Sequence, residues 1–153
     1  MRRLRPWLFA LAVLLLLGSG GRVLFHVAVN DQLNTKAKAG NVPRMQALLR
    51  QGADVDGRSV HFKTPLMSAA EGGSGGAVLF LLAHGVDVNA HTGSGSVLTW
   101  AVASGNAGIV RTLLVRGANV KWRSDAGDTA LKMAREYKQP AIAKMLQAAG
   151  ATN

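Results

Sequence analysis

The order of apolar, small and polar residues predicts pairs of short amphipathic helices along most of the chain. The clearest copy covers residues 64–90. Thr64 suits a helix N-cap, because its hydroxyl accepts a hydrogen bond from the first turn, and Pro65 is tolerated at the first helical position. Apolar residues follow at helical spacing as far as Gly73, and a second apolar helix ends at Gly85. Glycine at both ends fits, since it readily adopts the left-handed conformation that terminates helices.

The same pattern occurs four times, in phase. The glycines expected to end the second helix are spaced by 33, 32 and 33 residues: Gly52, Gly85, Gly117 and Gly150. The residues expected to end the first helix keep that spacing: Gly40, Gly73, Gly105 and Lys138. The expected starts of the first helices are side chains that favour the N-cap position: Asp31, Thr64, Ser96 and Thr129. Repetition of several features in phase indicates a repeat protein.

The stretch Thr64-Pro65-Leu66-Met67-Ser68-Ala69 resembles the Thr-Pro-Leu-His-x-Ala signature of the ankyrin repeat family. The resemblance covers residues 31–151 and implies an all-α solenoid of about four helix-turn-helix repeats with loop fingers, preceded by an N-terminal hydrophobic helix. The expected repeats are a degenerate first cap, two central copies and a C-terminal cap: 31–57, 58–90, 91–123 and 124–153.

Two departures from the family pattern carry local expectations. The signature histidine, which in the family hydrogen-bonds loop backbone between repeats, is replaced in each copy: Asn34, Met67, Thr99 and Lys132. Asn34 and Thr99 can take over part of that role, whereas Met67 cannot. The glycines within residues 72–76 are unfavourable inside a helix, so the second helix of that repeat is expected to begin late, near Ala77.

The N-terminus has the pattern of an export or anchoring signal. Three arginines precede an uninterrupted apolar run of 11 residues at 7–17, shorter than the roughly 17 to 25 residues that span a bilayer. Small residues at 18–21 fit a signal peptide cleaved after Gly20 or Gly21. The alternative is an uncleaved transmembrane anchor that extends to Val29. In both readings the arginines stay cytoplasmic, and the repeats of an exported or membrane-anchored bacterial protein face the periplasm or cell envelope.

Charge is the strongest bias in composition. The net charge is +10, and without Arg2, Arg3, Arg5 and Arg22 there remain 14 basic and 8 acidic side chains, a net +6. This favours an acidic partner or an anionic surface. Nucleic acid is not expected, because one tyrosine and few aromatic residues offer little for base stacking.

Catalytic and metal-binding patterns are not recognised. The chain has no cysteine, and its four histidines form no zinc-binding spacing. Asp125 and Asp128 read as turn formers rather than a general acid and base. We therefore expect no cofactor, no metal site, no catalytic residue and no enzymatic activity.

The resemblance implies a monomeric, non-catalytic protein–protein interaction module at the cell envelope. The alternative is an envelope inhibitor, an immunity-like or stress-protective protein that binds and shields an enzyme. In ankyrin-like stacks the loop tips and the exposed side of each first helix form the binding surface, whose side chains are not expected to hold the repeats together. The candidate partner-binding residues are Val60, His61, Lys63, Glu71, Thr92, Ser94, Ser104, Asp125, Asp128, Glu136 and Tyr137.

Overall fold

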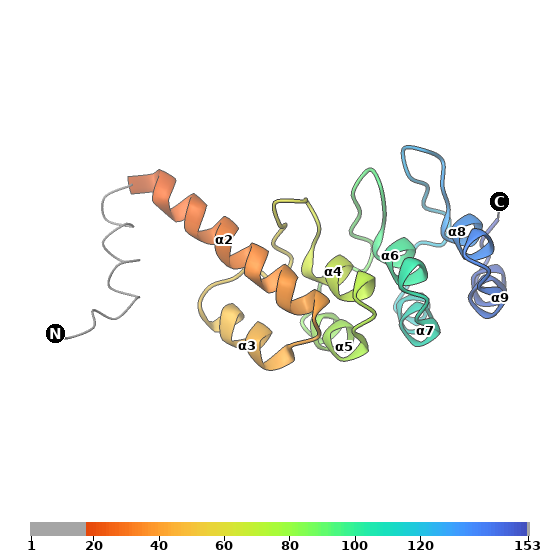
Figure 1. Ribbon diagram of the computed structural model, residues 1–153, viewed down its shortest axis with the longest axis horizontal. Coiled ribbons are helices and arrows are strands. Elements are labelled where there is room, and N and C mark those ends of the chain that lie inside the picture. The colour runs from red at the N-terminus through yellow and green to blue at the C-terminus, as the bar shows by residue number, and fades with distance from the viewer. Residues whose placement is uncertain (1–17, 153) are drawn as a thin grey trace.

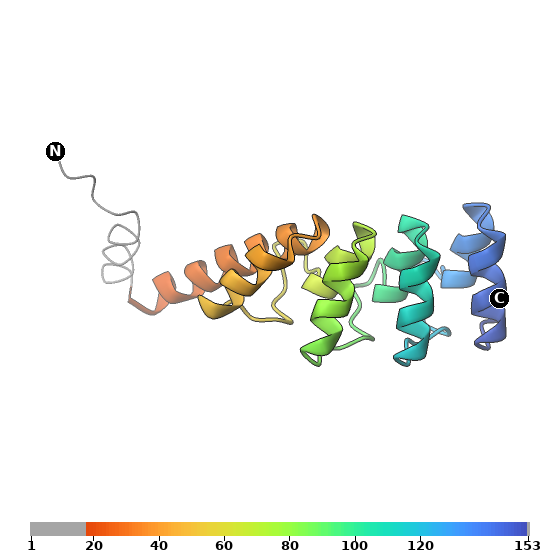
Figure 2. The same cartoon turned by 90° about the horizontal axis from the view of Figure 1, so that it is seen from below.

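Pairs of antiparallel helices stack side by side along one axis (Figures 1 and 2). The structure, a computed structural model, describes residues 18–152. The described helices are α2 (Gly18–Lys38), α3 (Val42–Arg50), α4 (Pro65–Glu71), α5 (Gly75–Ala83), α6 (Val97–Ser104), α7 (Ala107–Val115), α8 (Ala130–Glu136) and α9 (Pro140–Ala148). Among the described residues, β structure is limited to two isolated bridges, and there is no extended strand. This arrangement confirms the predicted all-helical repeat architecture.

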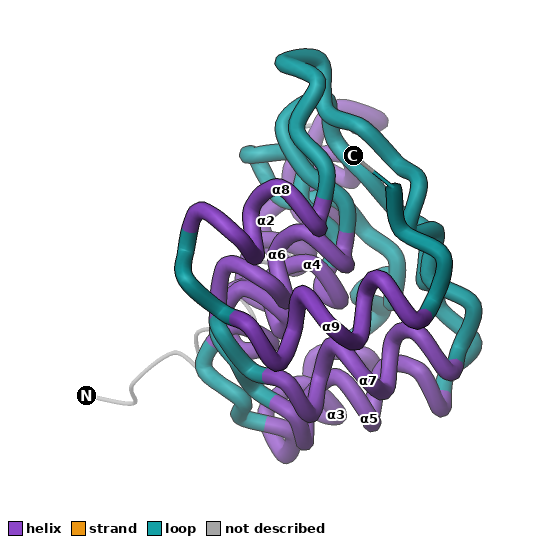
Figure 3. The backbone as a smooth tube through the Cα atoms, turned by 90° about the vertical axis from the view of Figure 1, so that its right-hand side faces the viewer, coloured by secondary structure: helices purple, strands orange, loops and turns teal. Residues whose placement is uncertain are grey.

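The helices form two rows, and the loops project from one side of them. In the end-on view of Figure 3, α2, α4, α6 and α8 form the first-helix row, and α3, α5, α7 and α9 form the second-helix row. Three loops rise beside the first-helix row; we call them finger 1 (residues 58–63), finger 2 (residues 91–95) and finger 3 (residues 123–128) (Figures 1 and 3). The buried core consists of leucine, isoleucine, methionine, valine and small alanine side chains from both rows.

The predicted helix starts at Thr64, Ser96 and Thr129 are confirmed. Each side-chain oxygen accepts a hydrogen bond from the backbone N–H three residues later, at 3.3, 3.3 and 3.1 Å. These bonds satisfy N–H groups that have no partner within the helix. Cap chemistry is local, which is why the sequence identified it.

The predicted helix ends are confirmed as well. All eight positions have a positive φ: Gly40, Gly52, Gly73, Gly85, Gly105, Gly117, Lys138 and Gly150. Seven are glycines, which adopt this conformation without steric cost. Lys138 adopts it with a φ of 54° although it carries a side chain.

The predicted helix start at Asp31 is wrong. Asp31 lies inside α2, where its carbonyl oxygen accepts a hydrogen bond from the Thr35 hydroxyl at 3.0 Å. Residues 22–38 contain neither glycine nor proline, so nothing local interrupts the helix. α2 therefore extends well beyond α3 toward the N-terminus (Figure 1).

The predicted late start of α5 near Ala77 is also wrong, because the helix begins at Gly75. The preceding residue, Ser74, is held by its hydroxyl, which donates to the Lys38 carbonyl oxygen at 2.9 Å. This contact with the previous repeat fixes the chain where helix propensity is poor. Tertiary contacts often override propensity in this way.

Asn34 links the first two repeats, as predicted. Its amide donates to the Gly57 carbonyl oxygen at 3.0 Å, and its side-chain oxygen accepts from the Ser68 hydroxyl at 2.8 Å. Thr99 instead forms a capping box with Ser96 inside its own repeat. The two substitutes for the signature histidine thus have different roles.

The predicted hydrophobic N-terminal segment at residues 7–17 lies outside the described residues. Val29, the last residue of the longer expected anchor, is 6% exposed and packs in the repeat core. Among the described residues, none of the helices combines the length and apolar character that crossing a bilayer requires.

Candidate interaction surface

The fingers and the exposed side of α4, α6 and α8 form one surface along the stack (Figures 1 and 3). Six of the candidate partner-binding residues are exposed: Val60, His61, Ser94, Asp125, Glu136 and Tyr137. The other five are half-buried: Lys63, Glu71, Thr92, Ser104 and Asp128. All eleven thus have side-chain surface that solvent reaches, and this surface spans the second, third and fourth repeats.

Glu71 connects the first and second repeats. Its carboxylate lies 3.2 Å from the Lys38 ammonium and 2.9 Å from that of Lys63. Burial alone would raise the pKa of Glu71, but the hydrogen bonds from Lys63 and Lys38 outweigh it and hold the pKa below its usual value. Glu71 is therefore a carboxylate at neutral pH, neutralised by two cations.

Lys63 extends this connection to the third repeat. Its Nζ lies 3.5 Å from the centre of the Trp100 ring on α6, which is the geometry of a cation–π contact. Lys63, Glu71 and Lys38 therefore help to hold three repeats together. The expectation that side chains of this surface do not hold the repeats together is wrong for Lys63 and Glu71, because Glu71 pairs with Lys38 of the first repeat and Lys63 contacts Trp100 of the third.

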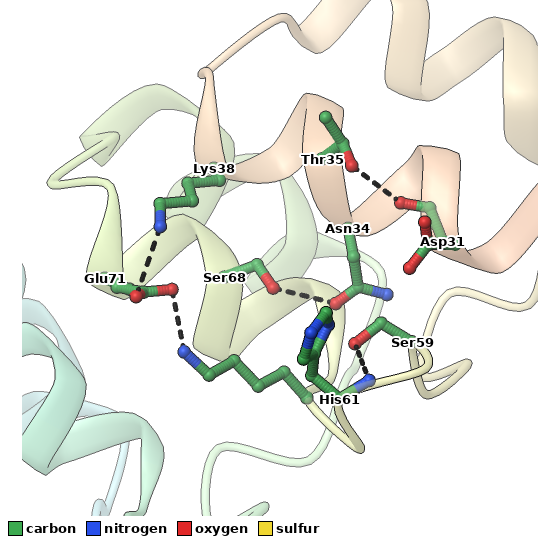
Figure 4. Close-up of a pocket in the computed structure, with 9 residues that line it drawn as sticks. Asp31, Asn34, Thr35, Lys38, Ser59, His61, Ser68 and Glu71 are labelled. Carbon is green, nitrogen blue, oxygen red and sulfur yellow. Dashed lines mark hydrogen bonds and ion pairs between the residues drawn. The ribbon is translucent and has the colours of Figure 1, made fainter.

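A polar hollow of about 290 Å³ lies between α2, α4 and finger 1. Figure 4 shows this hollow, with Lys38 reaching Glu71, Ser68 reaching Asn34, and the backbone N–H of His61 directed at the Ser59 hydroxyl. Its residues are Asp31, Asn34, Thr35, Lys38, Ser59, His61, Lys63, Ser68 and Glu71. Three candidate residues, His61, Lys63 and Glu71, are thereby brought together.

Fingers 2 and 3 are joined through their backbones. The Asp125 N–H donates to the Gly93 carbonyl oxygen at 2.9 Å. Within finger 3, the Ser124 N–H donates to the Asp128 carbonyl oxygen at 3.0 Å, which confirms that this segment is a turn. The Asp128 carboxylate also pairs with Lys132. Both aspartates thus have structural partners.

Finger 1 carries an exposed aromatic side chain, Phe62, that the sequence pattern did not predict. Phe62 is 71% exposed, and its φ is +60°. The sequence contains a signal for this conformation, because Phe62 precedes Thr64 by the same two residues that separate Gly127 from Thr129 in finger 3. Trp122, by contrast, is half-buried and packs against His91, with ring centres 5.7 Å apart.

The histidines are distributed rather than clustered. His61 and His91 are exposed on fingers 1 and 2, while His84 follows α5 and packs against Phe80. Over residues 18–152, no three histidine, cysteine, aspartate or glutamate side chains converge in a way that would hold a metal ion.

Comparison with known proteins agrees with this geometry. The family model for the ankyrin repeat matches residues 61–93. The chain is 30% identical over 115 residues to a transient receptor potential cation channel subfamily A member 1 homolog of Caenorhabditis elegans, and 37% identical over 120 residues to the B-cell lymphoma 3 protein homolog of Mus musculus. It is 34% identical over 124 residues to ankyrin repeat and SAM domain-containing protein 6 of Danio rerio.

These alignments cover 75%, 77% and 79% of this chain but only 10%, 25% and 15% of the respective relatives. The chain therefore spans a quarter or less of the length of these relatives. Paired helices, fingers and these similarities together define the class: the chain belongs to the ankyrin repeat family. Ankyrin repeats are protein–protein interaction modules and are generally non-catalytic.

Proposed function

We propose that the chain binds an acidic partner protein across fingers 1 to 3 and the exposed side of α4, α6 and α8. The observation that carries the proposal is the continuity of this surface over three repeats whose fingers are fixed to one another. The Arg58 guanidinium of finger 1 donates to the His91 carbonyl oxygen of finger 2 at 3.3 Å, and finger 2 is joined to finger 3 through Gly93 and Asp125. Such a surface loses little entropy when a partner binds.

The positive charge of the chain favours an acidic partner. Without Arg2, Arg3, Arg5 and Arg22 the chain keeps a net charge of +6, which would accelerate encounter with a negatively charged protein, and dissolved salt would weaken that effect. The interacting chain is a monomer in this proposal, because the repeats bury their apolar faces against one another.

The binding test inserts a large side chain in the middle of the proposed surface. Ala103 is exposed on α6, at the position that Glu71 and Glu136 occupy in the neighbouring repeats. Ala103→Glu adds bulk and a negative charge, so it should weaken binding to an acidic partner isolated from envelope extract by at least about tenfold, which corresponds to about 1.4 kcal/mol. The matched control is Ala141→Glu, at an exposed alanine of α9 in the second-helix row. If the α9 variant alone loses binding, the partner uses the other face.

We further propose that the repeats lie outside the cytoplasmic membrane, in the cell envelope. The support is the basic and apolar pattern of residues 1–17. Alkaline phosphatase fused after Asn153 should be active in a bacterial host. Mass spectrometry then separates the two versions: a mature start at Gly21 or Arg22 indicates a cleaved signal, and an intact Met1 in the membrane fraction indicates an anchor. An intact chain confined to the cytosol would exclude both.

A further inference from the structure

The tip of finger 1 presents an aromatic side chain in an unfavourable backbone conformation. Phe62 has a φ of +60°, a region that side chains with a Cβ avoid. Such a conformation lowers folding stability unless other contacts compensate for it. Packing does not compensate, because 71% of the Phe62 surface is exposed, and the neighbouring Val60 is 58% exposed. Nothing in the folded chain therefore explains phenylalanine at this position.

Finger 3 contains the same turn with glycine in place of phenylalanine. In finger 1, the Phe62 N–H donates to the Ser59 carbonyl oxygen at 2.8 Å, and the Ser59 N–H donates to the Lys63 carbonyl oxygen at 2.9 Å. In finger 3, the Gly127 N–H donates to the Ser124 carbonyl oxygen at 2.8 Å. Gly127 has a φ of +79°. Glycine is the residue that this turn prefers, so phenylalanine is an addition that folding does not require.

The base of finger 1 is held firmly while its tip stays exposed. The Arg58 guanidinium donates to the Phe62 carbonyl oxygen at 2.7 Å and also to His91 of finger 2. Lys63, the next residue, is fixed by Glu71 and Trp100. The backbone around Phe62 is thus organised before any partner arrives, which lowers the entropy lost on binding.

We infer that Phe62 is the anchor residue of the interface, and that it inserts into an apolar pocket on the partner whose rim carries Asp and Glu side chains. The inference rests on the proposed protein-binding function and names the partner's chemistry. Fixed, exposed aromatic residues are typical of the few side chains that dominate binding energy. Arg58 flanks the tip and is exposed, and Lys63 at its base is a second cationic side chain. The charge around the anchor therefore matches an acidic rim.

The first experiment separates folding from binding. Phe62→Gly installs the residue of finger 3, so the full-length variant should melt at the same temperature as the parent or up to about 4 °C higher. A lower melting temperature would show that Phe62 supports the fold, and would contradict the inference. Val60→Ala, which leaves the turn conformation unchanged, serves as a second variant with an unaltered backbone.

The second experiment identifies what the tip touches. Because the chain contains no cysteine, Phe62→Cys accepts a single benzophenone maleimide. The labelled full-length chain is irradiated in envelope extract, beside Val115→Cys, whose parent residue is 82% exposed on α7. We expect one protein adduct at position 62 and none at position 115, with crosslinked peptides containing apolar residues flanked by Asp or Glu. A lipid adduct, a second copy of this chain, equal labelling at both positions or no adduct would each overturn the inference.

The crosslinked protein, once purified, is the probe for affinity. Phe62→Gly should weaken its binding at least tenfold by calorimetry, and Val60→Ala should weaken it less. The dissociation constant should rise with salt. If Phe62→Gly binds within threefold of the parent while Ala103→Glu binds at least tenfold more weakly, the proposed function stands and the anchor is wrong. If neither variant changes binding, both proposals fail.

Discussion

At the residue scale, Asn89 and Asp56 occupy equivalent positions in successive repeats, but within the described part of the chain only Asn89 has hydrogen-bond partners for both polar atoms of its side chain. The Asn89 side chain accepts from the Asn119 N–H at 2.7 Å and donates to the Gly117 carbonyl oxygen at 3.4 Å. Asp56 occupies the same position one repeat earlier. Its Oδ1 atom is buried and has no hydrogen-bond partner among the described residues. Burial raises the pKa of Asp56, although a hydrogen bond from the Asp87 backbone opposes the shift.

Asp56→Asn should therefore stabilise the fold by about 0.5–1 kcal/mol at pH 7, because an amide N–H₂ can donate where the carboxylate oxygen is unpaired. The raised pKa gives the sign of the pH dependence. The folded state favours protonated Asp56, so the parent is relatively more stable below the ordinary pKa of about 3.8 and loses this advantage as pH rises. Urea unfolding of both chains should show a smaller difference at pH 3.5 than at pH 7. The converse variant, Asn89→Asp, should destabilise, and more so at pH 7; a loss that is independent of pH would contradict this account.

At the scale of the element, the helix ends follow a rule that one repeat breaks. Three of the first helices end at a glycine with positive φ, whereas α8 is followed by Lys138 with a φ of 54°. A side chain in this conformation is disfavoured by roughly 1–2 kcal/mol. Glycine at this position would avoid the penalty. Part of that gain would be lost, because glycine has more conformational freedom in the unfolded chain and loses more of it on folding.

Lys138→Gly should consequently stabilise the protein by about 0.5–1 kcal/mol, measured as a higher midpoint in urea with an unchanged slope. Gly85→Ala is the opposite test. A Cβ at Gly85 meets no atom within 4 Å, so its φ of +73° is the main source of cost. It should destabilise by about 1 kcal/mol. Stabilisation by Gly85→Ala together with destabilisation by Lys138→Gly would mean that unfolded-state entropy, and not the left-handed conformation, governs these positions.

Local chemistry explains which elements were predictable. Thr64 and Gly73 define their helix through their own hydroxyl and backbone freedom, so the ends of α4 follow from the sequence. The start of α5 does not, because Ser74 is held by Lys38 from another repeat. The candidate surface was predictable as a region, since repeat phase places its residues. The contacts of Lys63 were not, because Trp100 is distant in the sequence and only folding brings it near. The conformation of Phe62 was not either, because phenylalanine does not favour a positive φ.

At the scale of the whole molecule, each repeat contacts only the repeats next to it, so the stability of the stack depends on the contacts between neighbouring repeats. Lys38, Glu71, Lys63 and Trp100 form one such series of contacts across three repeats. We call these four residues the inter-repeat clamp. Partly exposed ion pairs contribute up to about 1 kcal/mol, and cation–π contacts about 0.5–1 kcal/mol. The clamp therefore makes a modest contribution to stability but a specific one to cooperativity between repeats.

Lys63→Met keeps the alkyl chain and removes the charge from the clamp. We expect a loss of about 1 kcal/mol at pH 7 and a broader unfolding transition, because coupling between the second and third repeats is weakened. The lowered pKa of Glu71 sets the pH dependence: the stabilisation is present above the ordinary pKa of about 4.5 and is lost as pH falls through the lowered value. The difference between variant and parent should therefore shrink in acid.

Lys132→Met is the matched control, since Lys132 forms ion pairs with Asp128 and Glu136 inside the last repeat. It removes the same charge without crossing an inter-repeat boundary. Its transition should remain as sharp as that of the parent, with a smaller loss of stability. If both lysine variants broaden the transition equally, the effect comes from net charge, and the clamp does not couple the repeats. If Lys63→Met alone does so, the surface proposed to bind the partner also helps hold the stack together, and a partner that contacts Lys63 or Glu71 would alter the coupling between repeats.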